Sequence, residues 1–150
     1  MGVVESLFRS RVPSTSQGGE VSYVIAIRPV NSIQPSECVD DARVLSLVAS
    51  IRRDGCWLQP VPIDRASGLV MDGNHRLRVA HLLGLRHMPC VPLSYDDPRV
   101  AVHCWRTGAP FDLRVLFAAL GRQELLPFKS TRHRFAPALP STEVRLDLLM

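Results

Sequence analysis

The stretch Leu69-Val-Met-Asp-Gly-Asn-His-Arg76 decides how the rest of the chain is interpreted. The apolar residues Leu69 to Met71 are typical of a short strand. Gly73 then permits a sharp turn and a close approach between the backbone and a ligand. A helix is predicted from about Asn74 to Leu83 and is closed by Gly84. The expected unit is therefore a strand, a turn and a helix.

This unit suits a phosphate group. The first turn of a helix presents N–H groups without intrahelical partners, at the positive end of the helix dipole. Arg76 adds a planar fork of donors that matches phosphate oxygens, and His75 adds another donor. A carboxylate beside a phosphate is costly unless a cation compensates, so Asp72 predicts Mg²⁺. From these residues alone, an ordinary strand–turn–helix stays open, with Asp72 as a helix cap and solvated arginines.

A second helix is predicted upstream. Its apolar face is formed by Val44, Leu47, Val48 and Ile51, which recur at the spacing of an amphipathic helix. Asp40 and Asp41 suit its positive N-terminus, Arg52 and Arg53 suit its last turn, and Gly55 can supply a left-handed cap.

The remaining elements are short. Strands are predicted at Tyr23–Ile27, Val61–Ile63 and Pro89–Leu93. A third helix runs from a cap at Asp112 through Leu120 to Gly121, and the tail from Leu125 to Met150 has few periodic cues. The order β, α, β, β, α, β, α predicts an α+β (mixed α/β) fold, in which helices flank a small mixed sheet.

The chain has 150 residues, the size of one domain. Residues 1–22 contain a Gly/Ser-rich stretch and are expected to be a flexible leader, and residues 23–150 to form a single domain. The four cysteines have no metal-ligand spacing and are expected to be small core residues in a reducing compartment. With no run of about 20 apolar residues and no signal-peptide pattern, a cytoplasmic protein is expected.

The formal net charge is +4, and Lys129 is the sole lysine among 18 basic residues. No block of like charge forms a basic arm, so nucleic-acid binding is not expected. A small anionic ligand explains the mild positive balance equally well. Oligomeric state is not readable, and a homodimer is expected only because dimers are common.

Four segments carry a resemblance to a known family. They are Ile33-Gln-Pro-Ser-Glu37, the helix end Ser50 to Gly55, Gln59-Pro-Val-Pro-Ile63 and Met71-Asp-Gly-Asn-His-Arg76. Together they resemble the ParB/sulfiredoxin-like fold. Sulfiredoxins carry a catalytic cysteine where this chain has Asn74. ParB partition proteins carry Gly-Glu-Arg-Arg and a downstream helix-turn-helix. This chain has Gly73-Asn-His-Arg76 at the motif, and no helix-turn-helix is expected in the residues that follow it.

The chain is most similar to a third branch, the free L-serine kinases. Their Asp-Gly-His-His-Arg motif resembles Asp72 to Arg76, and their Lys-Thr-Thr-Arg-His motif resembles Lys129-Ser-Thr-Arg-His133. Their early Pro-x-Glu segment matches Pro35-Ser-Glu37. The resemblance covers about residues 25–135, and it departs at Asn74 and Ser130, where those motifs have histidine and threonine.

This resemblance implies an Mg-dependent phosphotransferase that moves the terminal phosphate of ATP or ADP to free L-serine. The product is O-phospho-L-serine, a precursor in amino-acid biosynthesis. Glu37 is the expected base, because a carboxylate can accept the hydroxyl proton during attack, and Asp72 is expected to help place Mg²⁺. The nucleotide phosphates are expected at Gly73, Asn74, His75 and Arg76. The substrate is expected at Ser50, Trp105, Thr131, Arg132 and His133.

Two alternatives stay open. One is a kinase that acts on another small hydroxyl compound and keeps Glu37 and the phosphate motif. The other is a ParB-like regulator that binds a nucleotide as a switch.

Overall fold

A mixed three-stranded sheet lies at the centre of the computed structural model, which describes residues 22–150. Its strands are β1 (Ala26–Pro29), β3 (Val61–Asp64) and β4 (His87–Leu93), in the order β1-β4-β3. Strand β1 is antiparallel to β4, whereas β3 is parallel to it. The leader expected at residues 1–22 lies almost wholly outside the described residues.

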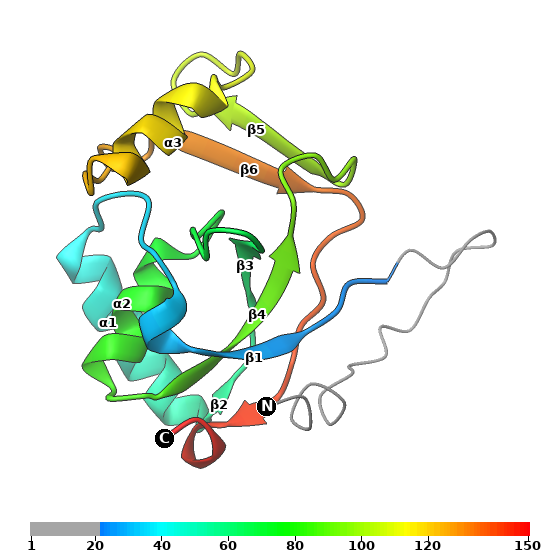
Figure 1. Ribbon diagram of the computed structural model, residues 1–150. Helices are drawn as coiled ribbons and strands as arrows, with labels where there is room; N and C mark the ends of the chain where they lie inside the picture. Colours follow the sequence, from blue (N-terminus) through cyan, green and yellow to red (C-terminus); the bar gives the residue numbers. More distant parts are fainter. Residues whose placement is uncertain (1–21) are drawn as a thin grey trace.

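Two helices pack together beside this sheet (Figure 1). Helix α1 (Asp41–Asp54) begins as predicted, since the Asp40 side chain accepts the Ala42 N–H at 3.0 Å. It ends at Gly55, which has a left-handed φ of 69°. Helix α2 (Asn74–Leu82) connects β3 to β4, because parallel neighbours need a crossover.

Strand β4 is buried on both of its faces. Met88 and Cys90 belong to the main core with residues of α1 and α2, whereas Val91 and Leu93 belong to a second cluster. This alternation is the period of two that a strand imposes on its side chains. The sheet therefore separates a helical layer from a second layer.

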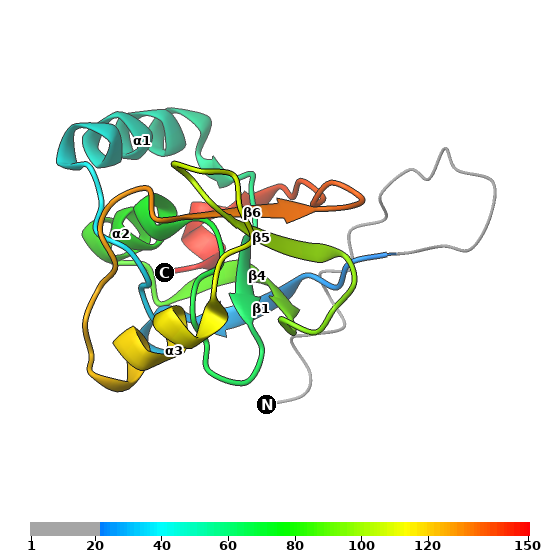
Figure 2. The ribbon, with the colours of Figure 1, turned by 90° about the horizontal axis from the view of Figure 1, so that it is seen from above.

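The second layer contains the antiparallel pair β5 (Val100–Cys104) and β6 (Thr131–Phe135), with α3 (Leu113–Gly121) between them in sequence (Figure 2). The cap of α3 at Asp112 is confirmed, since its carboxylate accepts the Arg114 N–H at 3.0 Å. The prediction of a tail without regular structure is wrong at β6. Alternate residues of Thr131–Phe135 are half-buried or buried, a two-residue period that charged side chains obscure in the sequence.

The last segments close the molecule near α1. The short strands β2 (Cys56–Trp57) and β7 (Val144–Arg145) pair antiparallel, and the 3₁₀ turns η1 (Val30–Ser32) and η2 (Leu146–Leu148) complete the described elements. Trp57 is 1% exposed and anchors this part of the core.

The segment that leads into α2 differs from the predicted strand. Leu69 and Val70 form only isolated bridges, to Gln34 and Ile63, and the Val70 bridge to β3 is antiparallel. This segment therefore folds back along β3, and Gly73 comes to lie against Val61, the first residue of that strand. Asp72, which precedes Gly73, consequently lies near the beginning of β3.

The cysteines only partly match the expectation of core residues. Cys90 is buried, Cys56 and Cys104 are half-buried, and Cys38 is exposed. Burial raises the pKa of the Cys90 thiol to about 12. Within residues 22–150, none of the helices combines the length and the apolar character that crossing a membrane requires.

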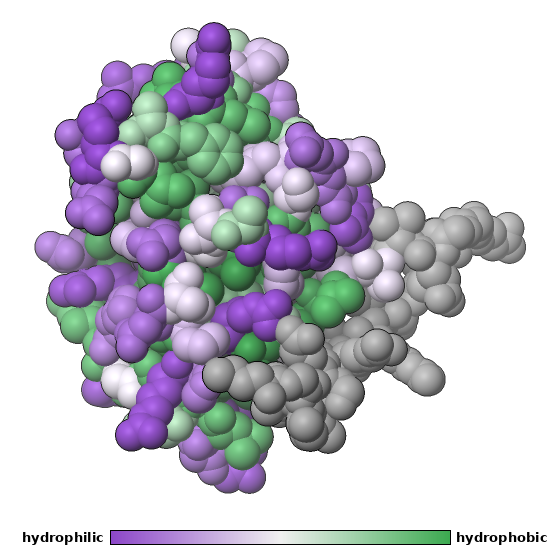
Figure 3. Space-filling view, in the orientation of Figure 1, coloured by the Kyte–Doolittle hydropathy of each residue, from purple (hydrophilic) through white to green (hydrophobic). Residues whose placement is uncertain are grey.

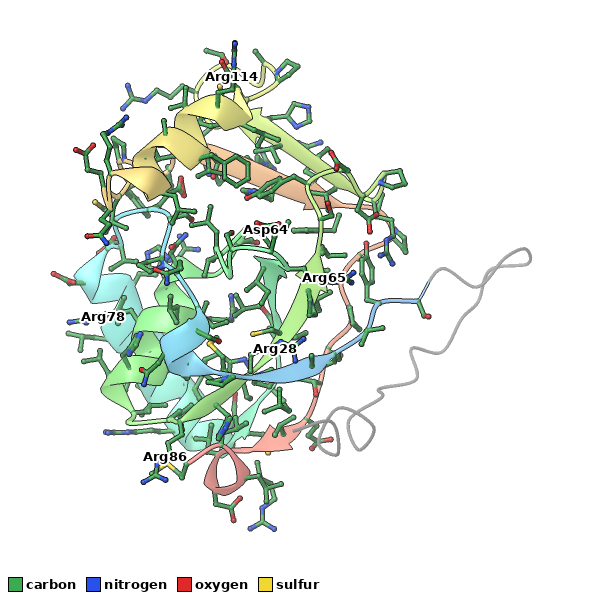
Figure 4. The ribbon with its side chains drawn as sticks, viewed as in Figure 1. Arg28, Asp64, Arg65, Arg78, Arg86 and Arg114 are labelled. Atoms are coloured by element: carbon green, nitrogen blue, oxygen red, sulfur yellow. The ribbon has the colours of Figure 1, made fainter. Side chains whose placement is uncertain are left out.

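Figure 4 shows Arg78, Arg86 and Arg114 on separate parts of the molecule, so these charges are spread out. Figure 3 shows a hydrophobic area over α3, where Val115 and Phe117 are exposed side chains.

The turn that contains Gly68 is tightly packed against Ser32. The φ of Gly68 is 76°, and an added Cβ would collide with the Ser32 carbonyl oxygen. Gly55 has a similar φ of 69° but open space around its Cβ position. We expect Gly55→Ala to cost about 1–2 kcal/mol of unfolding free energy through backbone strain, and Gly68→Ala to cost about 1–3 kcal/mol more through overpacking. Urea unfolding measures both, and equal costs would contradict this account.

Candidate active site

A cavity of about 300 Å³ brings together ten of the eleven residues that the sequence nominates. They are Glu37, Asp72, Gly73, Asn74, His75, Arg76, Trp105, Thr131, Arg132 and His133. These residues come from the loop before α1, the start of α2, and the facing ends of β5 and β6. Ser50 instead lines a neighbouring cavity of about 190 Å³, which shares Leu47 and Arg76 with the first.

The start of α2 forms one wall. Gly73 is its N-cap, with a φ of 118°, and no side chain caps the first turn within the described part of the chain. A Cβ on Gly73 would lie 3.2 Å from the methyl groups of Val61, so this position favours glycine on two grounds. Asp72 is therefore not the helix cap, and the alternative in which it only caps an ordinary helix is wrong. The first-turn N–H groups can face an anion.

The side chain of Asn74 is engaged behind this wall. Its Oδ1 accepts the N–H of Ser36 at 2.8 Å and the N–H of Glu37 at 3.2 Å. Its Nδ2 donates to Ser36 Oγ at 3.0 Å. The sequence nominated Asn74 for nucleotide contact, and the structure leaves its backbone, more than its amide, for that role.

His75 links the two helices as a neutral imidazole. Its Nε2 accepts the backbone N–H of Asp40 at 3.1 Å, which requires that nitrogen to be unprotonated. Burial lowers the pKa of His75, and Arg43 lowers it further. Its ring also makes an edge contact with Phe128 at 5.6 Å between centroids. His75 therefore keeps Nδ1 as the atom that can donate to a ligand.

Cationic side chains surround the cavity. Arg76 is half-buried, and this burial lowers the pKa of its guanidinium while Asp72 opposes the shift. Arg43, which sequence reasoning missed, lies on α1 and also lines the cavity. Its helical spacing from Leu47, one turn further along, was the available signal. An arginine remains charged at neutral pH, so this wall favours an anionic ligand.

The carboxylate of Glu37 is held by residues at the start of β6, which form the wall opposite α2. Its Oε1 accepts the N–H of Ser130 at 2.7 Å and the N–H of Thr131 at 2.8 Å. The Thr131 hydroxyl adds a longer contact of 3.4 Å to the same oxygen. Burial raises the pKa of the Glu37 carboxyl, the N–H donors of Thr131 and Ser130 oppose this shift, and Asp72 adds to it. The carboxyl group is thus fixed in place and more basic than an exposed glutamate.

The end of the β5–β6 pair carries a group of cations on an aromatic ring. Trp105 has Arg132 over its ring at 4.9 Å and Lys129 at 5.5 Å, and Lys129 also lies 5.4 Å from the ring of Phe128. Lys129 has a φ of 58°, which is rare for a residue with a side chain. Trp105 therefore orients cations in this structure.

His133 lies deeper, at the base of the cavity. Its Nε2 is 3.2 Å from the Tyr95 hydroxyl, and its Nδ1 is buried without a hydrogen-bond partner. Burial lowers the pKa of His133 to about 4. The imidazole is therefore neutral at physiological pH, and the orphan nitrogen can bond a ligand that enters the cavity.

The acidic side chains fit a magnesium ion that arrives with a nucleotide. Asp72 lines the cavity beside Arg76, and Glu37 lies opposite. In residues 22–150 no group of three or more His, Cys, Asp and Glu side chains could hold a metal unaided. Mg²⁺ in nucleotide sites is usually bound by one or two carboxylates together with phosphates, and Asp72 meets that requirement.

Comparison with known proteins gives a consistent picture. The ParB N-terminal domain family matches residues 11–104. A protein named ATP-dependent L-serine kinase, from Desulfurococcus mucosus, is 26% identical over 119 residues, which cover 77% of this chain and 46% of the relative. A ParB-like protein from Sulfolobus acidocaldarius is 28% identical over 104 residues, covering 65% and 52%. The chain thus spans about half the length of these curated relatives.

A solved structure has the same fold. It is a glutamate-to-glutamine variant of a free serine kinase in complex with AMP, and it superposes with a TM-score of 0.75. The alignment covers 93% of this chain and 98% of that chain, with 13% sequence identity. The α+β, ParB-like fold predicted from the sequence is therefore confirmed.

The position of Glu37 predicts how its charge affects stability. Because the folded state raises its pKa, folded Glu37 binds a proton more tightly than unfolded Glu37 does. Unfolding free energy therefore falls as pH rises through the ordinary carboxyl pKa of 4.5 toward the raised pKa of the folded state, and the penalty is complete above that folded-state pKa. Glutamine keeps the shape and the acceptor oxygen without the charge. We expect Glu37→Gln to be more stable than the parent at pH 7 and to lose this advantage at pH 4.

Urea unfolding at both pH values measures the effect. The control is Glu143→Gln, which removes the charge of an exposed glutamate. A Glu37→Gln variant that is less stable than the parent at pH 7 would contradict the inferred direction of the shift.

Proposed function

The chain belongs to the ParB N-terminal domain family, and from this premise we propose that it transfers the terminal phosphate of a nucleotide to the hydroxyl of free L-serine. One observation carries the proposal. A single cavity places an uncapped helix start and Arg76 opposite a fixed carboxylate, Glu37, and the donors of Thr131 to His133. The names of the curated and structural relatives support the same activity.

The nucleotide phosphates are assigned to the start of α2. The N–H groups after Gly73 and the guanidinium of Arg76 donate to phosphate oxygens, and Arg43 adds positive charge from α1. Asp72 would hold Mg²⁺, which neutralises phosphate charge when it is bound. The donor is proposed to be ATP or ADP. Two relatives are named ATP-dependent, and one free serine kinase structure contains ADP.

Glu37 is proposed as the general base. All three of its donors bind Oε1, so Oε2 is the atom assigned to the serine hydroxyl. As that hydroxyl oxygen forms a bond to the terminal phosphorus, the bond from phosphorus to the bridging oxygen breaks and the hydroxyl proton passes to Glu37. The raised pKa of Glu37 makes its carboxylate a better acceptor for this proton.

The ends of the amino acid are assigned to β6. Arg132 is exposed over Trp105 and presents its guanidinium to the serine carboxylate. The orphan Nδ1 of His133 is a neutral partner for an ammonium or hydroxyl group. Ser50 lies outside this cavity, so it has no proposed contact with serine.

Phosphorus NMR tests the reaction directly. Purified protein with Mg²⁺ and L-serine is given ATP in one tube and ADP in another. We expect an O-phosphoserine resonance to grow as the terminal phosphate disappears, and the productive tube identifies the donor. Glu37→Gln is expected to reduce this turnover by at least 100-fold while nucleotide still binds. No phosphoserine in either tube, despite nucleotide binding, would reject serine and favour another hydroxyl substrate or a nucleotide-binding regulator.

Arg76 tests the phosphate wall. We expect Arg76→Ala to weaken ADP binding by more than tenfold, because a half-buried guanidinium that faces the cavity is lost. Calorimetric titration gives the affinity. Arg78→Ala is the matched control, since Arg78 is exposed on the same helix and points outward in Figure 4. Equal affinities for the two variants would remove the start of α2 from the proposed site.

A further inference from the structure

Asn74 is a buried polar residue whose side chain is directed at a neighbouring loop. It is 8% exposed, and its amide oxygen accepts two consecutive backbone N–H groups, those of Ser36 and Glu37, at 2.8 and 3.2 Å. Its amide nitrogen donates to Ser36 Oγ at 3.0 Å. Asparagine supplies one acceptor and one donor from the same short side chain, which this geometry requires.

The contact continues through Ser36 into the segment before α2. Ser36 is 4% exposed, and its hydroxyl donates in turn to the Val70 carbonyl oxygen at 2.9 Å. The chain of bonds joins α2, the Glu37 loop and the Leu69–Met71 segment. Breaking one member leaves buried donors without partners, which costs far more than the net gain of making the bond.

Glu37 is held in other directions as well. Next to it, the Cys38 N–H donates to the Leu126 carbonyl and the Leu126 N–H donates to the Ser36 carbonyl, both at 2.9 Å. Its carboxylate is fixed by Ser130 and Thr131. Those contacts tie Glu37 to the β6 side of the cavity. The bonds to Asn74 tie it to the helix whose first turn is assigned to the nucleotide phosphates.

We propose that Asn74 is a positioning residue that sets the distance between the base Glu37 and the phosphate-binding start of α2, and that its side chain does not contact the nucleotide. This inference rests on the proposed function, because it assigns a role in the same reaction. Phosphoryl transfer depends on the relative placement of base, hydroxyl and phosphate, so a loosened Glu37 loop lowers kcat more than it lowers nucleotide affinity.

Three variants and a control separate positioning from contact. Asn74→Ala removes both ends of the brace. Ser36→Ala removes the acceptor of Asn74 Nδ2 and the donor to the Val70 carbonyl oxygen, but it keeps the two backbone bonds that the Asn74 amide oxygen accepts. The double variant removes both sets of bonds. Asn31→Ala removes an exposed asparagine as the control. Calorimetry with ADP gives nucleotide affinity, phosphorus NMR gives kcat and KM, and amide hydrogen exchange reports the N–H groups of Ser36 and Glu37.

We expect Asn74→Ala to lower kcat at least tenfold with the Kd for ADP within threefold of the parent. The Ser36 and Glu37 amides should exchange at least tenfold faster, and Ser36→Ala should show a smaller change. The double variant should resemble Asn74→Ala, because both substitutions disrupt one network. If Asn74→Ala does not fold, the same exchange and affinity measurements on Ser36→Ala decide the question.

Two results would overturn the inference. An ADP Kd weakened tenfold or more with kcat retained would show that the Asn74 amide contacts the nucleotide. Unchanged exchange of the Glu37 amide, or unchanged kcat despite fast exchange, would show that the brace does not position the base. If the parent protein binds ADP but does not phosphorylate serine, the proposed function fails. The brace is then judged by amide exchange alone, and slow exchange in Asn74→Ala rejects it.

Discussion

The carboxylate of Glu37 is the interaction on which the rest of the site depends. Its Oε1 accepts the backbone N–H groups of Ser130 and Thr131, which follow Glu37 by 93 and 94 positions in the sequence. Hydrogen bonds to an ionised acceptor are shorter and stronger than neutral ones. They join the loop before α1 to the first residues of β6, and so bring the two walls of the cavity together. The residue proposed to do the chemistry also links the two walls of the cavity.

The same constraint explains the unusual backbone of Lys129. A left-handed φ of 58° costs about 1–2 kcal/mol for a residue with a side chain. It directly precedes the two N–H groups that point at Glu37. The hydrogen bonds to Glu37 follow directly from this turn, which also presents the sole lysine near the rings of Trp105 and Phe128. Strain of this kind concentrates at functional sites, where the surrounding structure maintains it.

Features that depend on a few neighbouring residues, such as helix caps, could be predicted from the sequence. The caps of α1 at Asp40 and Gly55, and the cap of α3 at Asp112, follow from single residues and their spacing, and they are confirmed. Strands β5 and β6 were missed because their paired residues lie 27 to 35 positions apart in the chain, and because arginines obscure the alternation of β6. The family resemblance predicted that Thr131, Arg132 and His133 bind the substrate, but it did not indicate that they form the start of a strand.

The sequence could not predict which cavity or which neighbour each side chain contacts. Ser50 and Arg43 both belong to α1 and lie about two turns apart on one face, yet Arg43 lines the main cavity and Ser50 the neighbouring one. Asn74 follows Gly73 directly, so a phosphate contact was a reasonable prediction for its side chain. Only the position of the Glu37 loop, set by long-range pairing with Leu126, reveals another partner.

The charges around the cavity explain why a neutral residue is suited to the position of Asn74. Arg43, Arg76, Lys129 and Arg132 approach one small space, where they repel one another in the absence of an anion. Both cavity histidines are neutral, because burial lowers their pKa values, so neither adds to the repulsion at neutral pH. The nucleotide phosphate proposed to bind here would relieve the repulsion among the arginines and lysine. A neutral amide at position 74 adds no charge to this balance, which is the physical advantage of bracing Glu37 with asparagine.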